Sequence, residues 1–312
     1  MTTATPVVTR ELSQRTTLAL VVAVAVFAGG NFTALKFASD HTSPLFLSGL
    51  RAAIGGPVLF IVARLRGETL PRSPRLLGNI FVVSLAVTTT SSALLVIGVS
   101  RVPAGVASLI ASTMPLFTAV LAVFALATRI LPRAAVGLAI GLAGTATLAS
   151  GSLGGDGSAI GLLAMVGATF TWAFGTVYLS WADFSEISAT LLVAIQLVMS
   201  AVVLIPLAAL VEDVGSTDWG LGLLVPLAYA SFIASSLTFT LLSTIALYAS
   251  PTQAAATAYL MPLFGVLFGW LLADETLGWA QLLGGLLVVA GVFFVVTAPA
   301  RSARRVEEAP GD

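Results

Sequence analysis

The sequence predicts an all-α membrane protein with ten transmembrane helices, arranged as two inverted repeats of five helices. Three observations predict this fold class. Hydrophobic residues make up 58% of the 312 residues and charged residues only 9%, with a mean hydropathy of +1.04. Apolar runs long enough to cross a bilayer recur along the chain, and arginines gather in alternate breaks between them. Segments of the first half of the chain recur in the second half.

The composition requires a surface that faces lipid. A soluble domain has about 25% charged residues, so a chain with 9% cannot cover a globule with polar groups. The apolar runs show no polar alternation, which favours helices over a β-barrel. The chain has no cysteine and a single histidine, His41, so we expect no disulfide, no metal site and no cofactor.

Apolar runs between charged or turn-rich breaks define the expected helices. The clearest breaks are residues 64–75, 150–158 and 211–220. A helix needs about 20 apolar residues to cross the hydrocarbon core, which divides the chain into ten spans at 17–39, 43–63, 76–99, 103–127, 133–150, 159–180, 187–210, 221–246, 252–273 and 278–297. The tails are residues 1–16 and 298–312. Because the first tail lacks a signal-peptide cleavage site, we expect the first helix to act as a signal anchor.

The arginines orient these helices. Loops rich in arginine and lysine stay in the cytoplasm. With the N-terminus placed there, the cytoplasmic segments hold Arg10, Arg15, Arg64, Arg66, Arg72, Arg75, Arg129, Arg133, Arg301, Arg304 and Arg305. The external loops hold only Arg101. We therefore expect a multi-pass protein of the plasma (cytoplasmic) membrane with both termini in the cytoplasm.

An internal repeat divides the chain into two parts. MPLF stands at 114–117 and again at 261–264, and FAGGNF at 27–32 falls opposite WAFGTV at 172–177. The offset is 145 to 147 residues, and it also pairs Gly137 with Gly284 and Gly144 with Gly291.

Five helices in each repeat imply inversion. Because five is odd, the second repeat must cross the membrane in the opposite sense to the first. We expect the repeats at 17–150 and 159–297. Inverted repeats can exchange conformations and so open a central cavity to either side in turn, which favours transport. A duplication retained only for packing is the alternative.

Two segments carry a family resemblance. The run SLIASTMPLFTAVLAVFAL at 108–126 and its counterpart at 258–295 resemble the two EamA repeats of the drug/metabolite transporter (DMT) superfamily. The second half matches better, with an Asp-Glu-Thr loop at 274–276 and a Leu-Gly-Gly helix at 283–285. The first half has Ala-Thr-Arg at 127–129, where the family often has Gly-Glu-Arg. The resemblance covers nearly the whole chain. It implies a ten-helix exporter or exchanger of amino acids, related metabolites or drugs.

We therefore predict a secondary transporter that exports or exchanges a small polar metabolite, such as an amino acid, by alternating access around a central cavity. A permease or channel for drugs or other metabolites has the same fold and stays open as an alternative. An intramembrane enzyme is disfavoured and no catalytic residue is predicted, since no span pairs a nucleophile with a base. The expected partners are the lipid bilayer and a small-molecule substrate, with no nucleic acid; a homodimer stays open.

Cations inside predicted spans are candidates for the substrate site, because a charge near the centre of a membrane helix costs about 2.5–3.5 kcal/mol. Arg51 lies within the second span and Lys36 near the outer end of the first. We predict that Arg51, together with Lys36, attracts an anionic group such as a substrate carboxylate. The alternatives are snorkelling of Lys36 to the interface and pairing of Arg51 with Asp40 or with helix-end carbonyls.

Polar and aromatic residues within the spans complete the predicted substrate site. They are Asn31, Trp172, Thr176, Tyr178, Gln196, Tyr229 and Tyr259. Asn31 follows a Gly-Gly pair that could instead be a packing notch, and Gln196 is the repeat equivalent of Arg51. Pro115 and Pro262 are predicted hinges, because each removes a backbone hydrogen bond in the middle of a helix; a static bend is the alternative. No carboxylate lies clearly within a span, so the energy coupling stays open.

Overall fold

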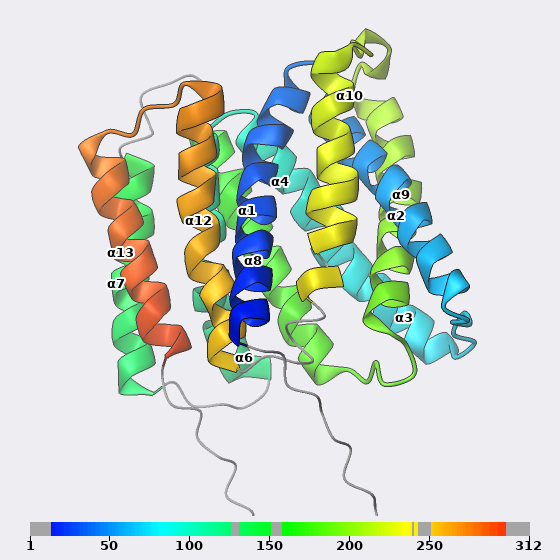
Figure 1. The fold of residues 1–312 in the computed structure, drawn as a ribbon, viewed down its shortest axis with the longest axis horizontal. Coiled ribbons are helices and arrows are strands. Elements are labelled where there is room, and N and C mark those ends of the chain that lie inside the picture. Colours follow the sequence, from blue (N-terminus) through cyan, green and yellow to red (C-terminus); the bar gives the residue numbers. More distant parts are fainter. Residues whose placement is uncertain (1–13, 126–130, 151–157, 239, 243–250, 298–312) are drawn as a thin grey trace, which may run out of the picture.

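The computed structural model describes residues 14–125, 131–150, 158–238, 240–242 and 251–297, which are almost entirely helical and include no strand (Figure 1). Within them, nine helices are long and apolar enough to cross a membrane. A further helix, α12, has 23 residues and supplies the tenth crossing. The predicted all-helical membrane fold is confirmed.

The ten crossings follow the predicted spans to within a few residues where both ends are described. They are α1 (Gln14–Ser39), α2 (Pro44–Leu65), α3 with η1 and α4 (Pro74–Val83, Ser84–Thr90, Ser91–Val99), α5 with α6 (Ala104–Ala111, Met114–Ala125), α7 (Pro132–Ser150), α8 (Ser158–Trp181), α9 (Ala189–Val211), α10 with η3 (Leu221–Ala228, Tyr229–Leu237), α12 (Pro251–Ala273) and α13 (Trp279–Val296). A short 3₁₀ turn, η2 (Val214–Ser216), precedes α10.

Local chemistry explains where several helices begin. Pro44 and Pro74 stand in the first turn of α2 and α3, where a missing N–H costs nothing. Ser73 and Ser188 precede α3 and α9, and their hydroxyl groups accept hydrogen bonds from backbone N–H groups of the first turn.

Contacts between the two repeats hold the bundle together. α2 packs along α9 and α7 along α13 on opposite flanks, while α1 packs against α12 and α8 against α4 and α6 between them (Figure 1). Each of these pairs joins the first repeat to the second, so neither repeat is a separate body. Five crossings precede α8, which therefore starts on the side where α1 ends, and the repeats are inverted.

Glycines bring the flanking helices into backbone contact. A Cβ atom on Gly144 of α7 would lie 2.6 Å from the backbone nitrogen of Val288 in α13. On the other flank, a Cβ on Gly56 of α2 would lie 3.0 Å from the backbone nitrogen of Val198 in α9. Such close approach is how membrane helices gain contact without a hydrophobic driving force.

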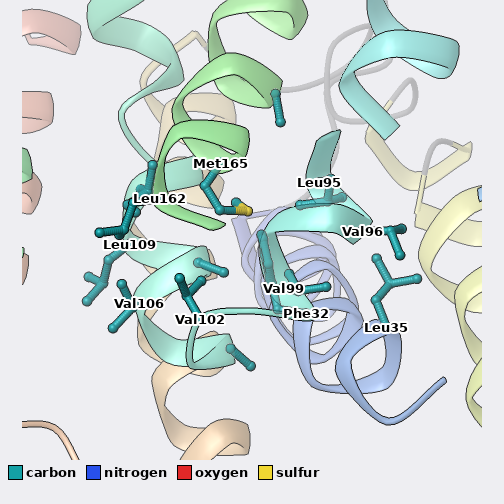
Figure 2. Close-up of a cluster of buried hydrophobic side chains, with 14 of the residues drawn as sticks. Phe32, Leu35, Leu95, Val96, Val99, Val102, Val106, Leu109, Leu162 and Met165 are labelled. Carbon is teal, nitrogen blue, oxygen red and sulfur yellow. The ribbon is translucent and has the colours of Figure 1, made fainter. Parts of the chain in front are cut away.

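The largest buried cluster lies mainly away from the chain termini. α1 begins and α13 ends on one side of the bundle, the terminus side; the opposite side is the far side (Figure 1). The cluster includes Phe32 and Leu35 near the far end of α1, and Val99 and Val106 at the far ends of α4 and α5 (Figure 2). In this structure a packed apolar core fills the far-side part of the bundle between α1, α4 and α5.

Candidate functional site

Two π-helical segments occupy equivalent places in the two repeats. η1 begins at Ser84 in the third crossing and η3 at Tyr229 in the eighth, 145 residues later, which matches the repeat offset. π-helical turns are rare and frequently occur at functional sites. The pair therefore marks the centre of the bundle as the candidate site.

Hydroxyl groups fix η1 against α9. Ser84 Oγ and Thr88 Oγ1 both donate to the backbone carbonyl of Gln196, at 2.9 and 3.0 Å. Ser200 Oγ of α9 donates back to the carbonyl of Thr88 at 2.7 Å. Gln196, a predicted site residue, is thus buried at this contact, with 3% of its surface exposed.

Arg51 has no carboxylate partner within the described part of the chain. Its Nη2 atom donates to Ser92 Oγ of α4 at 2.7 Å, while its buried Nε has no hydrogen-bond partner. The ion pairs of the described residues involve other side chains, so the alternative of a pair with Asp40 is not observed. A guanidinium with a free donor can bind an anionic group.

Two further buried polar atoms, at about the same depth in the membrane as Arg51, have no hydrogen-bond partner. They are Asn31 Oδ1 in α1 and Thr89 Oγ1 in η1. Counted from the far-side ends of α1, α2 and α4, the three residues lie about 10–15 Å deep at 1.5 Å per residue. α1, α2 and α4 pack against one another. A free donor and free acceptors at mid-membrane are what a polar ligand would satisfy.

Tyr229 borders a cavity between α1, α10 and the end of α12. The cavity has a volume of about 500 Å³, and its walls are mostly apolar. Tyr229 donates to the carbonyl of Phe27 at 3.1 Å. Thr33, also in the wall, is buried and its hydroxyl has no partner. At the far-side mouth lie Asp40 and His41.

The predicted residues of α8 form no hydrogen bond with Arg51 in the described part of the chain; Thr176 donates to the carbonyl of Trp172. Leu163 and Phe174 are exposed apolar side chains on one face of α8. Trp172, which is 36% exposed, and Thr176 stand on the opposite face of the helix. Tyr178 lies near the terminus-side end and donates to Asn79 Oδ1 of α3 at 2.9 Å. Their substrate role stays a prediction. Tyr259 belongs to α12, but its side chain lies outside the described residues.

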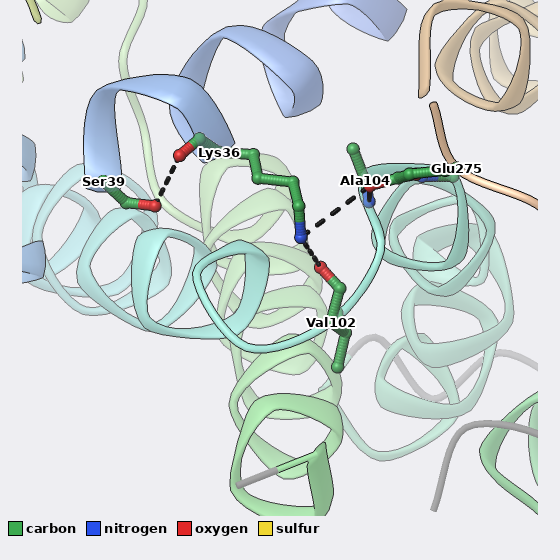
Figure 3. A network of polar contacts seen from close by, with 6 residues as sticks. Lys36, Ser39, Val102, Ala104 and Glu275 are labelled. Atoms are coloured by element: carbon green, nitrogen blue, oxygen red, sulfur yellow. Dashed lines mark hydrogen bonds and ion pairs between the residues drawn. The ribbon is translucent and has the colours of Figure 1, made fainter. Parts of the chain in front are cut away.

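Lys36 lies in a contact at the far side rather than beside Arg51. Its Nζ donates to the carbonyl of Val102 at 3.0 Å and lies 3.7 Å from Glu275 Oε1 (Figure 3). The Gly-Gly pair of the same helix has a packing role, since a Cβ on Gly29 would lie 2.8 Å from the Met261 carbonyl oxygen.

The two predicted hinge prolines differ in their surroundings. The fourth crossing is interrupted at Ser112 and Thr113, and Pro115 is the second residue of α6, which begins directly after this break. α12 continues through Pro262 without interruption. The helix break agrees with a hinge at Pro115, and the hinge function of both residues stays a prediction.

Comparison with known proteins gives the family. The sequence profile of the EamA-like transporter family matches residues 15–150 and again residues 159–297. This chain belongs to the EamA-like transporter family. The family and the named relatives are transporters, not enzymes.

Relatives of this EamA-like transporter cover almost its full length. The uncharacterized transporter YvbV of Bacillus subtilis (strain 168) is 28% identical over 92% of this chain and 94% of its own. A probable amino-acid metabolite efflux pump of Escherichia coli (strain K12) is 26% identical over 89% and 93%. The uncharacterized inner membrane transporter YedA of Escherichia coli (strain K12) is 28% identical over 86% and 87%.

A solved structure shares the fold of this EamA-like transporter. That structure, named only "Crystal structure of protein", superposes with a TM-score of 0.64 at 18% identity, and the match covers 90% of this chain and 96% of the other. The superposition shows the fold, and the family match with the relatives establishes a multi-pass membrane transporter.

Several features of this EamA-like transporter were not predicted from its sequence. The π-helices are the first, although the hydroxyl-rich runs at 88–92 and 235–238 are a signal that could have found them. Glu275 was assigned only to a loop motif, whereas its carboxylate bonds to α5. Ser92 and Thr89 lie within the run at 88–92, but the run does not show which of its hydroxyl groups contacts Arg51 and which stays without a partner.

Proposed function

We propose that this protein is a secondary transporter that exports or exchanges a small polar metabolite, such as an amino acid or related compound. Its two inverted repeats open a central site to each side in turn, and its termini lie in the cytoplasm. The observation that carries the proposal is Arg51, a cation at mid-membrane with a free Nε and no carboxylate partner in the described residues.

The polar groups at the depth of Arg51 match the two ends of an amino acid. Arg51 and Ser92 supply donors for a carboxylate, and Asn31 Oδ1 supplies a free acceptor for an ammonium group. Each such charge-assisted bond contributes about 1.5–3 kcal/mol. One relative is named a probable amino-acid metabolite efflux pump, which agrees with this class of substrate.

Transport by proteoliposomes tests the proposal. The purified protein is assayed for exchange of a panel of amino acids, purines and drugs, with and without a pH gradient. Arg51→Gln should lower the rate at limiting substrate at least tenfold, since about 1.4 kcal/mol corresponds to a factor of ten, and Arg51→Lys should retain part of it. The matched control is Arg101→Gln, because Arg101 is exposed and bonds only within its own turn. Unchanged rate and selectivity in Arg51→Gln would contradict the proposal.

A second candidate function is a permease for apolar or drug-like molecules, which the mostly apolar cavity beside Tyr229 favours. Val225 lies in the wall of that cavity, so Val225→Trp should fill part of it. If drugs are the cargo, this variant loses their transport while Arg51→Gln retains it. If amino acids are the cargo, the opposite pattern is expected.

A further inference from the structure

Glu275 joins the two repeats on the far side. It lies in the connection between α12 and α13, and its carboxylate accepts hydrogen bonds from the backbone N–H groups of Ala104 (2.6 Å) and Gly105 (3.0 Å), the first residues of α5. The carboxylate satisfies N–H groups that the helix leaves unpaired and interacts favourably with its positive end. Only 9% of the Glu275 side chain is exposed, so these bonds are largely shielded from water.

The backbone before Glu275 is shaped to present the carboxylate. Among the described non-glycine residues, Asp274 alone has a positive φ, 51°, a conformation that costs energy and is held only by its surroundings. The N–H of Glu275 donates to the carbonyl of Gly269 at 3.1 Å. A Cβ atom on Gly269 would overlap the Glu275 carboxylate, so glycine leaves the space that the carboxylate occupies.

Lys36 extends this contact to the first helix. Its Nζ lies 3.7 Å from Glu275 Oε1 and donates to the carbonyl of Val102, in the connection that leads into α5 (Figure 3). One polar cluster therefore joins α1, α5 and the connection after α12. These elements belong to the central part of the bundle, which alternating access has to rearrange.

A second glutamate shows the same chemistry within a flanking pair. Glu212 accepts hydrogen bonds from the N–H groups of Leu45 and Phe46, both at 3.0 Å, at the far-side start of α2. On the terminus side, Glu68 accepts from the hydroxyl of Ser188, which caps α9. The α2–α9 pair thus has a glutamate at each end.

No carboxylate stands at the repeat position equivalent to Glu275. At the repeat offset of 147 the equivalent residue is Thr128, which lies outside the described residues and has no carboxylate. The two halves of the fourth crossing also differ in burial, and the far-side half is the more buried one. Seven residues of α5, on the far side, are buried, whereas in α6 only Leu116 is.

We propose that Glu275 is the latch of a far-side gate. It positions α5 against α1 and α12 while the far side is closed, and its bonds to Ala104 and Gly105 break when the far side opens. The proposal rests on the alternating access proposed above, and it makes Glu275 a positioning residue, not a substrate ligand.

Cysteine accessibility tests the latch without any substrate. The chain has no cysteine, so Ala107→Cys, at a fully buried position of α5, is a single reporter. It is exposed to a membrane-impermeant maleimide in sealed vesicles whose far side faces the solution. Arg101→Cys, at an exposed far-side position, verifies that orientation. Glu275→Gln should raise the labelling rate of the Ala107→Cys reporter at least tenfold. Lys36→Met, which leaves the bonds to α5, should raise it less.

Two controls separate gate opening from loosening of the whole fold. Glu212→Gln removes the same type of contact from the flanking pair and should leave the Ala107→Cys reporter unlabelled. Ala194→Cys, at a fully buried position of α9, should stay unlabelled with Glu275→Gln. Unchanged labelling of Ala107→Cys, or an equal rise with Glu212→Gln or at Ala194→Cys, would overturn the latch. Because no substrate is needed, failure of the latch and failure of transport are separate results.

Discussion

η1 and η3 are equivalent segments of the two repeats, yet their hydroxyl groups bond to different partners. In η1, Ser84 and Thr88 donate across a helix interface to the carbonyl of Gln196 in α9. In η3, Ser235 and Ser236 donate to carbonyls five residues earlier in their own segment. The two hydroxyls of η1 anchor it to α9 of the other repeat, whereas these two serines of η3 satisfy its own backbone. Among the described hydroxyls of η3, Tyr229 at its first position is the one that donates to the other repeat, at the carbonyl of Phe27. We therefore expect the eighth crossing to move more readily than the third.

Polar residues on the flanking helices differ in a related way. η3 packs against α2, which carries Arg51, and η1 packs against α9, which carries Gln196. Arg51 has a free donor and a charge, while Gln196 is neutral and buried at an anchored contact. The two repeats therefore both contain a π-helix, but the polar residue on the helix packed against it differs in charge and in bonding. One repeat position carries a cation with an unpaired donor, and the other lies at a contact that holds two helices together.

The largest effect on stability should come from placing a cation at Gln196, the repeat equivalent of Arg51. Gln196→Arg places a second cation at a position that is 3% exposed and lies at a packed contact between α9 and η1. A charge near a helix centre costs about 2.5–3.5 kcal/mol, so the midpoint of detergent-induced unfolding should fall strongly. Gln196→Met, of similar length and without charge, is the control and should retain most of the stability. Normal stability of Gln196→Arg would show that this position of α9 can hold a cation as the position of Arg51 in α2 does.

The sequence predicted the architecture of the two repeats but not their different use. Apolar runs determine the spans, and the repeated MPLF segments at 114–117 and 261–264 reveal the offset. Arg51 was a candidate because a cation interrupts an apolar run. A π-helix, in contrast, changes the number of residues per turn without changing which residues are apolar. The apolar pattern therefore does not reveal it, and the hydroxyl-rich runs at 88–92 and 235–238 are the remaining signal.

Contacts between residues far apart in the chain were the other feature that the sequence did not predict. Glu275 bonds to residues about 170 positions earlier, and no local pattern marks such a pair. Lys36 was placed correctly near the far end of its helix, but its partners, Val102 and Glu275, belong to two other connections. Spacing rules predict neighbours on one helix; they do not predict which loop lies over which helix end.

A smaller effect should come from releasing η1 from α9. Ser84→Ala together with Thr88→Val removes both hydroxyl donors to the buried carbonyl of Gln196 while nearly preserving shape. Hydrogen bonds between membrane helices contribute about 0.6 kcal/mol on average, and an unsatisfied carbonyl adds to the cost. We expect a loss of about 1–2 kcal/mol in the free energy of unfolding, measured by denaturation in mixed micelles. A loss of less than about 0.5 kcal/mol would show that these hydrogen bonds do not anchor η1 to α9.

The smallest effect should come from the matching change in η3. Ser235→Ala together with Ser236→Ala removes two hydroxyl groups that bond only within their own segment. Such local bonds compete with the backbone ladder rather than joining helices, so the loss should stay below about 0.5 kcal/mol. Hydrogen exchange gives the second measurement. Amides of η3 should exchange faster than in the parent chain, while those of η1 stay unchanged. If the η3 pair costs as much stability as the η1 pair, both segments are anchors, and the eighth crossing is not the more mobile one.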